Sequence, residues 1–333
     1  MKICIVGAGA IGGMLGAKLA LAGHAVSLIL RGANLASVRA NGLTLIEANG
    51  DQHNVRPACV SDQLMVPGPQ DVVILAMKAH QVAAVAADLH HLLKAGTRIV
   101  TMQNGIPWWY FHKLDGPWQG TALASVDPDG NIARHIDVDR VIGAVVYPAS
   151  EVVRPGVIRV IEGNRFSLGE LDGTDSSDLR AIGAAFKGAG LRAPISSDIR
   201  SEIWLKVWGN LSFNPISALT HATLEDICLF GPTRALAATM MTEARHIGEK
   251  LGVRFKVSLE QRIAGAQAVG AHKTSMLQDV EQGRPLELQA LVGSVLELGR
   301  ITDTPTPAIE AVYAIASLLA RTLQSSGGVL RLG

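Results

Sequence analysis

The chain has 333 residues, of which 48% are apolar and 18% are charged, and its formal net charge is +1. This composition is typical of a well-buried globular protein and excludes a largely disordered chain. The near-neutral charge argues against nucleic acid or an anionic membrane as the main partner. A chain of this length is expected to form two domains rather than one.

The cysteines argue for a reducing, cytoplasmic setting. Cys4, Cys59 and Cys228 are odd in number and unrelated in spacing, so neither a disulfide framework nor a zinc site is expected. The histidines match no metal-binding helix motif, and we expect no metal. The N-terminal apolar residues are interrupted by glycines, unlike a signal peptide, and no apolar run reaches the ~20 residues of a membrane span.

The first 31 residues have the pattern of a dinucleotide-binding unit. Residues 2–6 read as a buried strand, residues 7–12 as the glycine loop GAGAIG, the residues up to Gly23 as a helix, and residues 24–31 as a second strand. Gly7 permits the tight turn, Gly9 lets the backbone approach a pyrophosphate, and Gly12 lets the helix close on the strand. A glycine-rich turn without a ligand is the alternative.

The end of the second strand indicates which nicotinamide cofactor is preferred. An NAD-binding site places Asp or Glu there to bind the ribose 2′-hydroxyl, whereas this chain has Arg31. A guanidinium suits a 2′-phosphate, so the sequence favours NADPH. An ordinary solvated arginine is the alternative.

Two further strands end in polar residues. Residues 71–78 and 98–105 read as strands that reach Lys78 and the Gln103-Asn104-Gly105 segment, with an amphipathic helix over 79–93 between them. Ligands of open parallel sheets bind outside the carboxyl ends of the strands. Lys78 and Asn104 are therefore candidates for contact with cofactor or substrate.

The remaining pattern predicts an α/β domain followed by an all-α domain. Residues 141–149 and 156–163 read as strands, which we expect to add antiparallel to the sheet edge, and residues 176–190 read as a helix. Helical periodicity then dominates 199–228, 232–252, 256–281, 285–301 and 306–324. We expect a Rossmann-type domain over 1–197, a helical substrate domain over 198–325 and a flexible tail over 326–333.

Polar residues line one face of an apolar helix predicted over 202–219. Lys206, Asn210 and Asn214 are spaced i, i+4 and i+8, and each four-residue step drifts by roughly 40°, so all three share a face. An ammonium or an amide on so apolar a helix is costly without a partner. We interpret this face as a ligand site, with a solvated helix face as the alternative.

Two later residues complete the candidate site. Ser275 offers a hydroxyl to a carboxylate or hydroxyl ligand, and Glu287 is a suitable ion partner for a desolvated Lys206. A helix-start serine and a solvated glutamate are the alternatives, since no spacing rule links either residue to the lysine.

These motifs together resemble the ketopantoate reductase family, which reduces 2-dehydropantoate to pantoate with NADPH. The resemblance covers roughly residues 1–300 and is carried by GAGAIG, MKAHQ at 77–81, QNG at 103–105, the helix at 204–219, and SMLQD at 275–279 with Arg284 and Glu287. It implies a two-domain fold, with Lys206 as general acid and Glu287 orienting it. It implies that Asn104, Asn210, Asn214 and Ser275 bind substrate. NADPH would be held by Gly7, Ala8, Gly9, Ala10, Ile11, Gly12, Arg31, Lys78 and Asn104.

The chain departs from the family pattern around the substrate. Gln289 stands where the family has Asp, and Val292 and His272 stand where it has Asn. Thr223-Leu224 replaces an Asn-Gly that some members have. The alternative that the protein reduces another branched or bulkier 2-oxo acid therefore stays open. So do a non-catalytic NADP(H)-binding regulator and an imine-forming amino-acid dehydrogenase. The sequence also leaves a homodimer open.

Overall fold

The computed structural model describes residues 1–329, and the chain forms two compact units. The first unit comprises Met1–Gln103, Trp108–Ala122 and Asp129–Glu202. The second comprises Asn104–Pro107, Leu123–Pro128 and the residues from Ile203 onward. The sequence predicts a boundary near residue 197, just before helix α6 (Ile199–Thr220). In the structure the first unit ends at Glu202, inside that helix. Two short segments of the N-terminal half thus belong to the helical unit.

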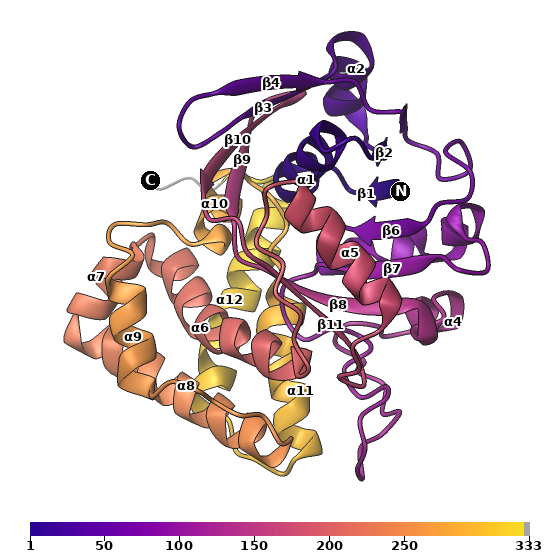
Figure 1. The fold of residues 1–333 in the computed structure, drawn as a ribbon. Coiled ribbons are helices and arrows are strands. Elements are labelled where there is room, and N and C mark those ends of the chain that lie inside the picture. The colour runs from indigo at the N-terminus through magenta and orange to yellow at the C-terminus, as the bar shows by residue number, and fades with distance from the viewer. Residues whose placement is uncertain (330–333) are drawn as a thin grey trace. The chain divides into compact units, whose positions relative to one another are not determined.

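A seven-stranded sheet is the core of the first unit (Figure 1). Its order is β11-β8-β7-β6-β1-β2-β5, and every neighbouring pair is parallel except β11 with β8. The central strands are buried along almost their whole length, as expected of a parallel sheet covered on both faces. The strands are β1 (Lys2–Val6), β2 (Ala25–Ile29), β5 (Cys59–Ser61), β6 (Val72–Leu75), β7 (Arg98–Thr101), β8 (Val141–Val146) and β11 (Phe166–Glu170).

A second, four-stranded sheet completes this unit and was not predicted. Its order is β4-β3-β10-β9, from β3 (Leu43–Ile46), β4 (Gln52–Val55), β9 (Ala149–Arg154) and β10 (Val157–Glu162). The expectation that both 141–149 and 156–163 add antiparallel to one edge was wrong. Strand β8 runs parallel to β7, and β10 leaves that sheet to pair parallel with β3.

Helix α1 (Ala10–Leu21) packs between the two sheets, which explains its glycines. A Cβ at Gly16 would lie 2.8 Å from Leu28 of β2, and one at Gly13 would lie 2.8 Å from Ile158 of β10. The helix is buried on most sides because it has a sheet on either side. Besides the short helical pieces between β6 and β7, this unit contains α2 (Gly32–Asn41), α4 (Asn131–His135) and α5 (Ser177–Gly188), with the 3₁₀ turn η3 (Val138–Arg140).

The amphipathic helix expected over 79–93 is broken into short pieces. A 3₁₀ turn η1 (Ala79–Gln81) is followed by a single turn α3 (Ala83–Ala86) and a second 3₁₀ stretch η2 (Ala87–Leu92). Leu89 and Leu92 are still fully buried, so the apolar spacing correctly indicated which side chains face the core. Apolar periodicity does not by itself distinguish an α-helix from successive 3₁₀ turns.

The second unit is helical, as predicted, within the described residues. Besides α6 it contains α7 (Leu224–Leu229), α8 (Gly231–Lys250), α9 (Leu259–Gln267), α10 (Ser275–Glu281), α11 (Ser294–Ile301) and α12 (Pro307–Ser325). A π-helical turn η4 (Gln289–Gly293) leads directly into α11. Of the expected tail, Ser326–Val329 forms a turn after α12, with Gly328 packed against Gly283, and residues 330–333 lie outside the described part.

Candidate active site

The glycine loop in the first unit has three glycines with three different constraints. Gly7 has a φ of +92°, and a Cβ there would lie 2.8 Å from the Cβ of Met77. A Cβ at Gly12 would lie 2.5 Å from the carbonyl oxygen of Gly7, whereas a Cβ at Gly9 would meet nothing within 4 Å. Gly7 is therefore needed for the turn and Gly12 for close packing of the helix, whereas Gly9 leaves open space beside the backbone.

This open space adjoins the N-terminus of α1, where a dinucleotide pyrophosphate would fit. Gly9 is the N-cap, its position has no side-chain capping bond, and the first turn of α1 has no acidic residue. The N–H groups of Gly7 and Ala8 both donate to the carbonyl oxygen of Ile29. The N–H groups of Ala10, Ile11 and Gly12 in the first helical turn have no acceptor within the helix and suit an anion.

The two predicted cationic residues of this unit lie at strand ends. Arg31 is exposed, follows β2 and is the N-cap of α2, and no acidic side chain within residues 1–329 forms an ion pair with it. Lys78 is the N-cap of the turn that follows β6. The Gln103 amide donates to the carbonyls of Leu75 and Met77 at 2.8 and 3.2 Å and so joins the ends of β6 and β7.

In the second unit, two tryptophans fix the orientation of helix α6. Trp204 and Trp208 are fully buried, and the indole N–H of Trp208 donates to the carbonyl of Met241 in α8 at 2.6 Å. On a helical projection these tryptophans lie opposite the face that carries Lys206 and Asn210. Anchoring the apolar face to α8 therefore directs the polar face away from the helical core.

Lys206 belongs to a hydrogen-bonded chain of three side chains. Its ammonium donates to Oδ1 of Asn104 at 2.7 Å, and the Asn104 amide nitrogen lies 3.4 Å from Oε2 of Glu287. Lys206, Asn104 and Glu287 come from α6, from the segment after β7, and from the residues before η4. The structure therefore brings together three candidate residues that are far apart in the sequence.

Burial perturbs the acidity of this lysine. Desolvation lowers the pKa of Lys206 from 10.5 to about 8, and the negative charge of Glu287 partly opposes that shift. The ammonium is therefore the main form at neutral pH, but with a proton that is more easily given up than that of an exposed lysine. Such tuning towards neutrality is typical of catalytic acids and bases.

The remaining predicted residues of this site share the second unit without joining that chain. Asn214 is only 5% exposed and Asn210 is half-buried, and neither amide has a hydrogen-bond partner among residues 1–329. Both amides are thus available to a ligand. Ser275 is the exposed first residue of α10, whose N-cap is Thr274. Across the described residues, no cluster of His, Cys, Asp or Glu is arranged to hold a metal ion.

Comparison with known proteins decides the family. The family models for ketopantoate reductase PanE/ApbA match residues 3–114 and, for its C-terminal part, 198–320. A 2-dehydropantoate 2-reductase of Mesorhizobium japonicum is 55% identical over 96% of this chain and 98% of its own length. This chain belongs to the ketopantoate reductase family. It is thus a member of a family of dinucleotide-dependent oxidoreductases that act on small molecules.

Solved structures agree with this assignment. A crystal structure from Ralstonia solanacearum MolK2, described as a ketopantoate reductase, is 43% identical with a TM-score of 0.91, and the match covers 97% of this chain and 98% of that one. A D-mandelate dehydrogenase solved with NADH and anilino(oxo)acetate has a TM-score of 0.82 at 20% identity, over 97% of this chain and all of that one. The second likeness establishes a shared fold alone.

The residues that depart from the family pattern lie in two places, the π turn η4 with Gln289 and Val292, and the contact between His272 and Leu224. Val292 is fully buried in η4. The carbonyl oxygen of His272 accepts a hydrogen bond from the backbone N–H of Leu224, so two of the departures meet. Gln289 lines a cavity whose lining includes none of Lys206, Asn210, Asn214 and Glu287.

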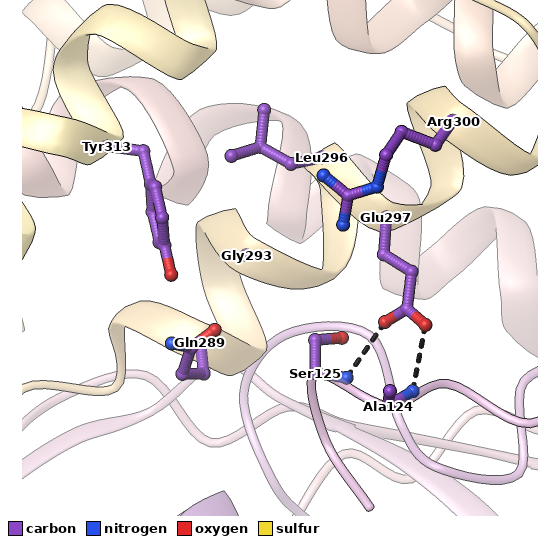
Figure 2. A pocket seen from close by; sticks show the side chains of 8 residues that line it. All are labelled: Ala124, Ser125, Gln289, Gly293, Leu296, Glu297, Arg300 and Tyr313. Carbon is purple, nitrogen blue, oxygen red and sulfur yellow. Dashed lines mark hydrogen bonds between the residues drawn. The ribbon is translucent and has the colours of Figure 1, made fainter. Parts of the chain in front are cut away.

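That cavity has a volume of about 290 Å³ and lies beside η4 and α11 (Figure 2). Glu297 of α11 accepts hydrogen bonds from the backbone N–H groups of Ala124 and Ser125, both at 2.8 Å. These bonds attach segment Leu123–Pro128 to the helical unit, an interaction that no sequence pattern indicated. The remaining lining residues are Gln289, Gly293, Leu296, Arg300 and Tyr313.

Helix α6 has one further feature that its sequence displays but the motif analysis did not use. Pro215 stands inside the helix, directly after Asn214. Proline has no N–H, so the carbonyl of Leu211 lacks its usual hydrogen-bond donor in the helix.

None of the helices within residues 1–329 has the length and apolar character needed to cross a membrane.

Proposed function

We propose that this protein reduces 2-dehydropantoate to pantoate with NADPH, and that Lys206 is the general acid. The observation that carries the proposal is the Lys206–Asn104–Glu287 chain, with an ammonium whose pKa lies near 8. The 55% identical relative named 2-dehydropantoate 2-reductase supports the substrate.

The chemistry explains why a lysine is needed. When bound, NADPH would supply the hydride that the ketone carbon accepts. Reduction leaves negative charge on the ketone oxygen, which an ammonium within hydrogen-bond reach stabilises before donating its proton. Because Lys206 is charged below about pH 8, its proton is in place at neutral pH. Glu287 and Asn104 keep that ammonium charged and oriented.

The neutral polar residues of the second unit would bind the rest of the substrate. Within residues 1–329 the amides of Asn210 and Asn214 have no hydrogen-bond partner, and Ser275 has an exposed hydroxyl. Amides and hydroxyls can bind the carboxylate and the hydroxyl group of the substrate without adding charge near the lysine. Asn104 would contact both substrate and cofactor, in addition to its bond with Lys206.

The first unit has the features expected of an NADPH site. The glycine loop leaves open space at Gly9 beside N–H groups that have no acceptor within helix α1, and these suit a pyrophosphate. Arg31 stands where an NAD-specific site has a carboxylate, and it would bind the 2′-phosphate. Lys78 would contact the cofactor from the end of β6. We assign residues 1–197 to cofactor binding and 198–325 to substrate binding and catalysis.

The setting of the enzyme is part of the same proposal. The three cysteines are free, and Cys4 and Cys228 are buried, which suits a reducing cytoplasm. The near-zero net charge offers nucleic acid no electrostatic attraction. A homodimer is compatible with exposed apolar residues on α12, such as Ile315 and Leu318.

A second candidate is reduction of another branched or bulkier 2-oxo acid. The departures at His272, Gln289 and Val292 favour it, although Val292 is buried and Gln289 lines a cavity whose lining contains none of the predicted substrate-binding residues. A non-catalytic NADP(H)-binding regulator would need no desolvated lysine held between an amide and a glutamate. An amino-acid dehydrogenase would require an added amine for turnover.

The test is NADPH oxidation by the full-length protein with a panel of 2-oxo acids, with and without ammonium or a primary amine. We expect 2-dehydropantoate to give the highest kcat/KM, with no requirement for an amine. Preference for a bulkier 2-oxo acid would support the second candidate. Tight NADPH binding without turnover of any acid would contradict the enzyme proposal and favour the regulator.

A further inference from the structure

The π turn η4 releases one backbone carbonyl from its usual helical role. The backbone N–H of Ser294 donates to the carbonyl of Gln289, five residues earlier, instead of to that of Ala290. The Ala290 oxygen accepts two other bonds, from Ser294 Oγ at 2.7 Å and from the backbone N–H of Ile106 at 3.0 Å. The π turn thus creates an acceptor for the segment Asn104–Pro107.

Gly105 is the residue that allows this segment to come so close. Its φ is +92°, and a Cβ there would lie 2.0 Å from the Ala290 oxygen and 2.9 Å from the Ala290 Cβ. The nearest obstructing atoms belong to the backbone of Ala290, which cannot move aside as the end of a flexible side chain could. Glycine is therefore required for both conformation and space.

Two residues close in sequence to this contact belong to the hydrogen-bonded chain Lys206–Asn104–Glu287. Asn104 precedes Gly105, and Glu287 precedes η4, so the contact with Ala290 fixes the two chain segments that carry them. Asn104 in turn accepts from the Lys206 ammonium at 2.7 Å and lies 3.4 Å from Glu287. A displacement of about 1 Å at Gly105 would separate the Asn104 amide from one partner or both.

We propose that Gly105 and the π turn Gln289–Gly293 form a positioning element that holds the Asn104 amide between Lys206 and Glu287. Neither touches the reacting atoms; they act through Asn104. The inference rests on the proposed role of Lys206 as the acid.

The proposal makes a prediction about the lysine itself. An acceptor bonded to the ammonium stabilises its charged form, so loss of the Asn104 bond lowers the pKa of Lys206. In Gly105→Ala, a Cβ would push Asn104 away, and we expect the pKa to fall from about 8 by roughly one unit. A purely structural role would reduce the folded fraction and leave the pKa of the folded protein unchanged.

The experiment is NMR titration of the Lys206 side-chain amine in the full-length protein, assigned with Lys206→Ala, together with the pH profile of kcat/KM. Gly252→Ala is the matched control, since Gly252 has a φ of +81° but nothing within 4 Å of an added Cβ. Gly105→Ala should shift both titrations to lower pH, and Gly252→Ala should shift neither. An unchanged amine titration in a folded Gly105→Ala variant would overturn the proposal.

Two further readouts keep the outcome decisive. If Gly105→Ala does not fold, Ser294→Ala removes only the hydroxyl bond to Ala290, and a smaller shift in the same direction is expected. A wild-type titration in Ser294→Ala would then overturn the proposal. Because the NMR titration needs no turnover, the two proposals can fail separately. If the wild type reduced no 2-oxo acid while the variants showed these shifts, only the proposed function would be refuted.

Discussion

Replacing Glu287 by Gln should move the alkaline limit of the reaction to lower pH. The variant keeps the shape of the side chain and removes its charge, which raises the pKa of Lys206 in the wild type. Two hydrogen bonds through the Asn104 amide place the ammonium within about 8 Å of the carboxylate. At an effective dielectric constant of about 20, that separation corresponds to about 2 kcal/mol, or about 1.5 pKa units before solvent screening.

The sign follows from the role of the ammonium as the acid. Reduction requires protonated Lys206, so kcat/KM for the 2-oxo acid should be constant below about pH 8 and fall tenfold per unit above it. In Glu287→Gln the fall should begin roughly one unit lower. Oxidation of the hydroxy acid requires the neutral amine, so its rate should rise over the same range.

The assay is initial-rate NADPH oxidation across pH 6 to about 10, at constant ionic strength. Glu260→Gln is the control, because that exposed carboxylate pairs with Arg234 and does not contribute to the shift in the pKa of Lys206. An identical alkaline limit in wild type and Glu287→Gln would refute the reasoning. A wild-type limit near pH 10 would show that burial does not lower the pKa of Lys206.

Three other changes test separate parts of the account. Arg31→Ala should raise the Kd for NADPH by about 10–100-fold and change that for NADH by less than about threefold, as measured by fluorescence titration; equal losses would contradict the 2′-phosphate role. Gly9→Ala should leave the thermal midpoint unchanged, since its Cβ meets nothing within 4 Å, yet weaken NADPH binding by about tenfold or more. Unaltered binding would place the pyrophosphate elsewhere. Trp208→Phe removes the hydrogen bond to Met241 and should lower the free energy of unfolding in urea by about 1–3 kcal/mol; an unchanged value would mean that the bond does not anchor α6.

The parts of the fold that depend on local pattern could be predicted from the sequence. The glycine loop, strands β1 and β2, and the run of helices after α6 follow from turn chemistry and from apolar periodicity over short windows. The polar face of α6 was predictable for the same reason, because Lys206, Asn210 and Asn214 lie on one helix at four-residue spacing. Glu287 was a candidate because of its charge, although no spacing rule linked it to Lys206.

Features that depend on distant pairing could not be predicted in this way. Thr44 of β3 pairs with Val157 of β10, and nothing in either segment specifies the other as partner. Lys206 and Asn104 are 102 positions apart, and a strand-end asparagine gives no sign of which lysine it meets. The π turn differs from an α-helix by one hydrogen-bond register, which composition does not encode, so the role of Gly105 required coordinates.

The central claim is that Lys206 supplies the proton during reduction of 2-dehydropantoate. It is tested most directly by single-turnover oxidation of bound NADPH by 2-dehydropantoate in wild type and Lys206→Ala, with the Kd for NADPH measured in parallel. The account predicts a rate lower by about 10²–10⁴-fold in the variant, with the NADPH Kd unchanged within about twofold. A variant that turns over at the wild-type rate with NADPH bound would contradict it.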